Sequence, residues 1–368
     1  MKYISFILKK QEAMNTMSAM NNALRFLFAD DSPADPLSPE EREETNRINR
    51  HGFTVLCRKE LADHLSSVRF CLLYVLFFLV CAASLYGAAG TLSEASHNMQ
   101  AAQMTDQSFN FLKLFTTNGS GIYSFSTFLS FLGPVFGIML GFDAVNNEEA
   151  QGTLNRLAAQ PIYRDTIINA KFAASAAMIV LTVFSIGGIL AGAGLLLTGI
   201  VPQAEEWIRL FVFLLMAAVY ISVWLAISML FSVLSRHAAT SALISVALWL
   251  FLTMFLSLAA NAIASVVFPA AKMQTAMDMV RQYRFSVGLN RISPCYLFSE
   301  ITSVLMNPNV RSLDIMSLME YQNGAIVSYL SLEQSLLQIW PHLAAMIAES
   351  ILGFAASYIA FMKKEIRA

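Results

Sequence analysis

The chain has 368 residues, of which 56% are hydrophobic and only 13% are charged, whereas a soluble globular chain has roughly 25% charged residues. This composition identifies an integral membrane protein. The formal net charge of -1, together with the lack of a basic patch with interleaved aromatic residues, argues against nucleic acid as a partner.

Residues 1–52 are predicted to form a mobile, acidic tail on the cytosolic side of the membrane. The part from 29 to 49 contains three prolines and several glutamates but has no strong hydrophobic pattern. Such a segment cannot bury enough apolar surface to offset the entropy that it would lose on folding.

Residues 53–69 are predicted to form an amphipathic helix that lies on the membrane surface. Apolar side chains recur at helical spacing from Cys57 to Leu61, while Lys59 and Glu60 occupy the remaining faces. The alternative is that this segment is simply the charged flank of the first span.

Six stretches are apolar and long enough to cross a bilayer core, which requires about 20 residues. They cover residues 70–90, 122–142, 172–201, 210–234, 238–268 and 341–362. The first five, with a polar hairpin at 143–171, make up residues 70–268. We expect the small residues of the third span to form one close-packing face, made by Gly187, Gly188, Gly192 and Gly194.

The hairpin at 143–171 is the most informative part of the chain. Glu148 and Glu149 stand where a helix is predicted to begin, so their charges complement the positive end of its dipole. Leu154 and Leu157 then fall on one face of this helix at i, i+3 spacing. The pattern predicts a short amphipathic helix.

The second half of the hairpin predicts a stop and a return into the membrane. Pro161 is expected to end the first helix, because the residue before a proline is pushed out of the α region. Asp165 or Thr166 can cap a second helix, which carries Lys171 to the membrane edge. An ordinary solvated loop is the alternative.

The order of these residues resembles the signature of type-2 ABC exporter permeases. In that family the segment forms a coupling helix, which docks into a groove of a separate ATPase subunit. The resemblance assigns ATPase coupling to Glu148, Glu149, Gly152, Thr153, Leu154, Leu157, Pro161 and Arg164. It also assigns an elbow helix to the run that contains Lys59, Glu60 and Leu61. The family often has a basic residue where this chain has Glu149.

Residues 269–340 are predicted to form a small helical domain on the outer side of the membrane. An amphipathic stretch covers 273–285, the segment 292–298 resembles a motif that precedes the last span of these permeases, and 327–339 is predicted to be a short helix. Residues 341–368 then form the sixth span and a basic cytosolic end.

The distribution of lysine and arginine predicts that both termini lie in the cytosol, with the plasma membrane as the location. Short segments on that side carry Arg58, Lys59, Arg69, Arg156, Arg164, Lys171, Arg236, Lys363, Lys364 and Arg367. The short outer loops carry only Lys113 and Arg209. This asymmetry follows the positive-inside rule, which places the hairpin in the cytosol independently of the resemblance.

The chain contains no GxxxxGK[ST] phosphate-binding loop, so it is not expected to bind ATP in the Walker manner or to be an enzyme. ATP and Mg are assigned to the partner ATPase. HExxH, GxSxG and clustered Cys/His motifs are also missing from the sequence, so we expect neither a catalytic nor a metal site.

We expect no ionised side chain in the central parts of the six spans. Intramembrane charges usually mark ion or proton pathways, so their absence would count against a proton- or sodium-coupled carrier. It would also favour an apolar or amphipathic cargo.

The resemblance implies an all-α membrane fold of six spans with an elbow helix, a coupling helix and a helical outer domain. It implies a permease subunit of an ATP-driven exporter that works by alternating access, with two ATPase subunits, a second permease subunit in a homodimer or heterodimer, and membrane lipid as partners. A lipid-modifying or intramembrane enzyme is one alternative, although its outer-domain acids form no recognisable constellation: Glu300, Asp314 and Glu320. A secondary carrier is the other.

Overall fold

The computed structural model describes residues 39–101, 109–119, 121–154, 163–269, 275–307 and 330–364. Within these ranges the chain is almost entirely α-helical and has no strand, apart from an isolated bridge between Gly119 and Ile122. The chain divides into two compact units, Met1–Ile48 and Asn49–Ala368. The second unit contains all the spans, and the predicted all-α class is confirmed.

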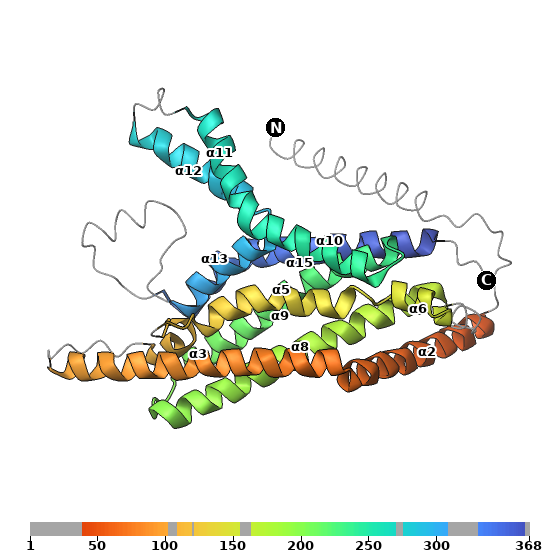
Figure 1. Ribbon diagram of the computed structural model, residues 1–368, viewed down its shortest axis with the longest axis horizontal. Helices are drawn as coiled ribbons and strands as arrows, with labels where there is room; N and C mark the ends of the chain where they lie inside the picture. The colour runs from red at the N-terminus through yellow and green to blue at the C-terminus, as the bar shows by residue number, and fades with distance from the viewer. Residues whose placement is uncertain are drawn as a thin grey trace, which may run out of the picture. The chain divides into compact units, whose positions relative to one another are not determined.

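Six helices are long and apolar enough to cross a membrane, as predicted. They are α3 (Val68–Ala101), α5 (Phe125–Gly141) with its short continuation α6 (Asn146–Ala150), α8 (Arg164–Thr198), α9 (Ala204–Leu234), the run α10 (Ala238–Leu250), η1 (Phe251–Phe255) and α11 (Leu256–Val267), and α15 (Leu332–Lys363). Shorter helices are α4 (Asn110–Thr116), α12 (Ala276–Asn290) and α13 (Pro294–Met306). Figure 1 shows α11 and α12 as neighbouring arms of a helical hairpin.

Helix α9 is the centre of the bundle. In its most apolar window 67% of the residues are buried, against 11% for the fifth span and for the sixth. Helix α5 packs closely against it because glycines remove side chains from the contact: a Cβ on Gly137 would lie only 2.5 Å from the carbonyl oxygen of Ile221. The exposed apolar faces of the outer spans are what a bilayer would cover.

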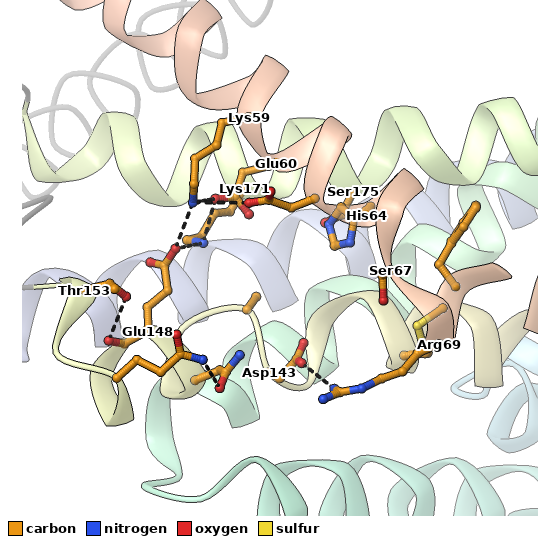
Figure 2. A pocket seen from close by; sticks show the side chains of 16 residues that line it. Lys59, Glu60, His64, Ser67, Arg69, Asp143, Glu148, Thr153, Lys171 and Ser175 are labelled. Atoms are coloured by element: carbon orange, nitrogen blue, oxygen red, sulfur yellow. Dashed lines mark hydrogen bonds and ion pairs between the residues drawn. The ribbon is translucent and has the colours of Figure 1, made fainter. Parts of the chain in front are cut away.

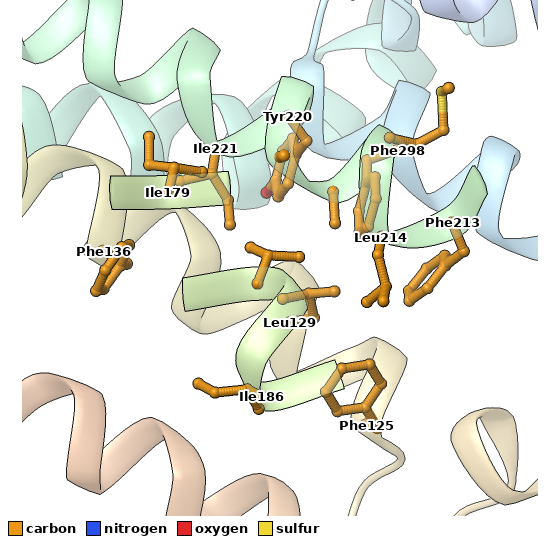
Figure 3. Close-up of a cluster of buried hydrophobic side chains, with 14 of the residues drawn as sticks. Phe125, Leu129, Phe136, Ile179, Ile186, Phe213, Leu214, Tyr220, Ile221 and Phe298 are labelled. Atoms are coloured by element: carbon orange, nitrogen blue, oxygen red, sulfur yellow. The ribbon is translucent and has the colours of Figure 1, made fainter. Parts of the chain in front are cut away.

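The main hydrophobic core joins α5, α8, α9 and α13, as Figure 3 shows. The rings of Tyr220 and Phe298 stack with centroids 4.5 Å apart, and the Tyr220 hydroxyl donates to the carbonyl oxygen of Ser130 at 2.8 Å. Helix α13, which the sequence places in the outer segment, is therefore packed into the bundle itself.

A buried arginine fastens the start of α9 to the segments around it. Arg209 is 0% exposed and pairs with Glu205 at 2.8 Å. Its guanidinium also donates to the carbonyl oxygens of Leu305 and Leu330 and to the Ser335 hydroxyl. The residue lies inside the helix rather than in the preceding loop, and a buried charge of this kind is stable only when its donors are satisfied.

Two helix starts differ from the prediction. Helix α2 (Pro39–Ser66) begins well before residue 53, because residues 40–44 are all glutamate or arginine, which favour helix, and no proline follows Pro39 within the helix. Helix α8 begins at Arg164 with Tyr163 at the N-cap, so the predicted cap at Asp165 or Thr166 is wrong. The Asp165 carboxylate instead accepts from the Thr166 backbone N–H inside the first turn.

The sixth span also begins earlier than predicted. Ser331 and Gln334 form a capping box that starts α15 at Leu332, so there is no separate short helix ending at 339. Pro341 lies inside α15 instead of starting the span. Proline removes one donor within a helix, but the rest of the helix continues across it.

The glycines of the third span do not share one face. Gly187 packs against Leu214 of α9, and Gly194 contacts Leu114 and Leu85. A Cβ on Gly188 or Gly192 would meet nothing within 4 Å. At about 3.6 residues per turn, Gly187 and Gly194 lie on one side of α8, while Gly188 and Gly192 lie on another. Only the first pair therefore forms a packing face within the subunit.

One expectation about charge is wrong. Glu349 lies in the middle of α15, within the sixth candidate span. The average hydropathy of a span tolerates one acidic residue, so the apolar pattern did not exclude it. The uncharged-span argument against an ion-coupled carrier therefore fails, and the absence of charge no longer supports an apolar or amphipathic cargo.

Candidate functional site

The described part of the predicted hairpin comprises α6, a tight turn and the start of α8. The Ser232 hydroxyl of α9 accepts from the backbone N–H groups of Val145 and Asn146, at 3.0 and 3.3 Å, and so fixes the start of α6. After α6 the chain turns at Gly152, whose φ of 68° is a backbone conformation that favours glycine. The Thr153 hydroxyl donates back to a carbonyl oxygen of α6.

Buried ion pairs join the hairpin to α2 and α8, as Figure 2 shows. The Lys171 ammonium of α8 lies 2.8 Å from Glu148 Oε1 of α6 and 3.1 Å from Glu60 Oε1 of α2. All three side chains are largely buried, with Lys171 only 5% exposed. Lys59 adds a more exposed positive charge, 3.2 Å from Glu60 and 3.6 Å from Glu148. Lys171 therefore connects α8 to both α6 and α2 through ion pairs.

The electrostatics of this network favour the charged forms. Burial alone would raise the pKa of Glu60, but Lys171 and Lys59 outweigh it and lower the pKa below the usual value. Burial likewise opposes the charge of Lys59, yet Glu60 and Glu148 raise its pKa. Burial lowers the pKa of His64, whose Nε2 lies 3.1 Å from the Ser175 hydroxyl.

A second set of contacts joins the hairpin to the end of α15. Lys364 Nζ lies 2.6 Å from Glu149 Oε2 and donates to the carbonyl oxygen of Val233 at the end of α9. The Arg164 guanidinium donates to the carbonyl oxygens of Lys364 and Phe361 and lies over the Phe361 ring. Glu149 is therefore the partner of a lysine contributed by this same chain.

A pocket of about 530 Å³ opens beside the ion-pair network. Arg69 and Asp143 pair across one part of its lining at 2.9 Å, and Phe70 and Met139 add apolar surface. Among the described residues no group of three or more His, Cys, Asp or Glu side chains is placed to hold a metal ion. The described ion pairs and hydrogen bonds connect α6 to α2, α8 and α15.

A family model described as ABC-2 family transporter protein matches residues 54–366, which is most of the chain. The chain belongs to the ABC-2 transporter family. It is the membrane-spanning permease component of an ABC transporter, and the family implies an ABC ATPase subunit as its partner. A comparison with curated proteins gives no match.

The structure of the permease distributes the predicted coupling residues over three environments. Glu148 and Thr153 belong to the ion-pair end of the hairpin, and Glu149 and Arg164 contact the end of α15. Leu154 is only 2% exposed and packs in a small core with Leu56 in the second half of α2, the start of α8 and the ends of α9 and α15.

The surface of the hairpin that faces outward is made by other residues. Within the described part of the hairpin the exposed positions are Asn147, Glu149, Ala150, Gln151, Gly152 and, just before α8, Tyr163. The predicted positions Leu157 and Pro161 lie outside the described residues. A partner that touches the permease here would meet the end of α6 and the turn at Gly152.

The predicted elbow residues also have distinct roles. Lys59 and Glu60 join the network, whereas Leu61 packs against the main core. The sequence did not assign roles to Lys171, Asp143 or Lys364, although a lysine eight positions into an apolar helix signals a buried partner. Nothing local in the sequence marks Lys364 as the partner of a glutamate 215 residues away.

Proposed function

We propose that the permease is the transmembrane subunit of an ATP-driven exporter, in which an ATPase subunit acts on the hairpin around α6. The observation that carries this proposal is the double connection of α6. Glu148 joins it to α2 through Lys171, and Glu149 joins it to α15 through Lys364. A displacement of α6 would therefore be passed both to α2 and to α15.

The family membership supports a partner ATPase, and the pattern of burial within the hairpin supports docking at its exposed residues. Leu154 is buried, so its side chain holds the hairpin to the bundle and is not available to a partner. Ala150 and Gln151 are exposed beside Gly152, whose positive φ shapes the turn. In this proposal the partner's groove receives these residues, on the cytosolic side of the plasma membrane.

Transport by alternating access requires a cavity between two halves, and the six spans of one chain form a single bundle around α9. We propose that two permease subunits and two ATPase subunits form the working transporter. ATP and Mg are bound by the ATPase subunits, and both termini of the permease lie in the cytosol, as the distribution of basic residues indicates. The direction of transport rests on the resemblance to exporters.

The test compares the same substitution at the two ends of the bundle. Ala150→Arg places a long charged side chain on the exposed end of α6, and Ala204→Arg does so at the exposed start of α9. We expect Ala150→Arg to reduce copurification of the ATPase subunit by at least tenfold, because a buried charge would have to be accommodated in the interface. Ala204→Arg should leave it unchanged.

Both variants should reach the membrane in wild-type amounts, since neither position is buried. Equal recovery of the ATPase with both variants would refute docking at α6. Loss of ATPase with the Ala204→Arg control alone would place the docking surface at the other end of the bundle.

A further inference from the structure

Glu349 lies far from both ends of its helix. It is the eighteenth of the 32 residues of α15, so about 25 Å of helix precede it and about 20 Å follow it. The hydrocarbon core of a bilayer is about 30 Å thick. A span in which Pro341 and Lys363 lie near the two interfaces places Glu349 well inside that core.

The side chain belongs to the face of α15 that packs on α9. Met346, three residues earlier, is fully buried, and Gly353, four residues later, lies against Ala226 of α9. Glu349 Oε2 is buried and has no hydrogen-bond partner among the described residues. The residue as a whole is only partly buried, so it also reaches the outer surface of the bundle.

The basic residues of the spans cannot neutralise this carboxyl. They lie near helix ends, where each described one has a partner of its own or borders the aqueous phase: Arg69, Arg164, Lys171, Arg209 and Lys363. No ion pair joins Glu349 to any basic side chain in the described part of the chain. An ionised carboxylate isolated in hydrocarbon is costly, so the ionised form of Glu349 requires a counter-charge that the described part of the chain does not supply.

We propose that Glu349 is the counter-ion for an amphipathic organic cation that reaches α15 from the lipid. The surface beside it suits the apolar part of such a ligand, because Leu352, three residues further along the same face of the helix, is 69% exposed. The carboxylate and the cation would form a pair with no net charge, which removes the main cost of each in the membrane. The inference rests on the proposed function, since the cation would then be cargo of the exporter.

Tetraphenylphosphonium is a suitable probe because it is apolar and permanently positive, and tetraphenylborate is an anion of nearly the same size. Equilibrium binding of both to the permease in lipid nanodiscs compares wild type with Glu349→Gln, which keeps the size of the side chain and removes its charge. Glu333→Gln is the matched control, since Glu333 lies exposed in the first turn of the same helix.

We expect Glu349→Gln to weaken phosphonium binding at least tenfold, while Glu333→Gln has no effect and borate binding does not weaken in either variant. Glu349→Asp should retain most of the phosphonium affinity, which separates loss of charge from loss of fold. Wild type without saturable phosphonium binding, or equal affinity in wild type and Glu349→Gln, would overturn the proposal.

The ATPase copurification test is independent of this measurement, because it is carried out without phosphonium and Glu349→Gln should recover the ATPase normally. Unchanged ATPase recovery with Ala150→Arg, together with intact cation binding, would refute docking at α6 and leave the cation site standing. Loss of ATPase recovery with Ala150→Arg, together with phosphonium binding that does not depend on Glu349, would support docking at α6 and refute the cation site.

Discussion

Replacement of Lys171 by methionine tests the ion-pair network directly. Lys171 is 5% exposed, and its ammonium lies within about 3 Å of Oε1 of both Glu60 and Glu148. The two carboxylate oxygens are therefore no more than about 6 Å apart. Methionine has a similar length, so the substitution removes the charge and leaves most of the apolar packing in place.

The expected cost follows from the repulsion that remains. At about 6 Å and an effective dielectric constant of about 20, two negative charges repel by about 3 kcal/mol. This agrees with the roughly 3–5 kcal/mol that breaking a buried ion pair costs. We expect Lys171→Met to lower the free energy of unfolding by about 3 kcal/mol, measured by titrating the purified permease in mixed micelles with SDS.

Lys59→Met is the matched control, because Lys59 contacts the same two carboxylates but is 47% exposed. An exposed ion pair contributes about 0–1 kcal/mol, so the control should be close to wild type. Adding Glu148→Gln to Lys171→Met removes the repulsion and should recover most of the loss. Equal costs for the two lysine variants would refute the assignment of Lys171 as the joint between the hairpin and α2.

Two further predictions concern pH and packing. The lowered pKa of Glu60 means that its ionised form is stabilised in the folded state, so this stability is present above the unfolded pKa of about 4.3 and is lost as pH falls through the lower folded pKa. The difference in melting temperature between wild type and Glu60→Gln should therefore be constant from pH 6 to 8 and shrink below about pH 4; a constant difference down to pH 3 would contradict the ion pairs. Gly137→Ala should destabilise the permease by about 1–3 kcal/mol in the SDS titration, because the added methyl group overpacks the contact with α9 at Ile221. Gly192→Ala, where nothing lies within 4 Å, should cost nothing, and equal effects of the two glycine substitutions would refute the close α5 to α9 packing.

The sequence by itself determined the class of the protein and the number of its spans. Both depend on long apolar runs, and the hydrophobic effect acts on such runs whatever their neighbours are. The hairpin was recognisable too, because a polar segment between two apolar runs can fold only at the surface of the bundle. The resemblance of this segment to ABC permeases agreed with the family that most of the chain matches.

The sequence was less informative about helix ends. The start of α8 at Arg164 and the passage of α15 through Pro341 depend on backbone hydrogen bonds that a motif does not encode. Glu349 lies within an apolar run of the sequence, so the hydropathy pattern did not single it out. Its significance came from its position in α15 and from its unpaired carboxyl oxygen.

Only the tertiary structure decided which hairpin residues hold it to the bundle and which face outward. Leu154 lies on the apolar face of the predicted helix, yet that face is covered by the permease's own helices. Lys171 meets Glu60 across 111 residues and Lys364 meets Glu149 across 215. Such pairs depend on how distant helices pack, because a charge finds its partner in space and local sequence patterns do not record that distance.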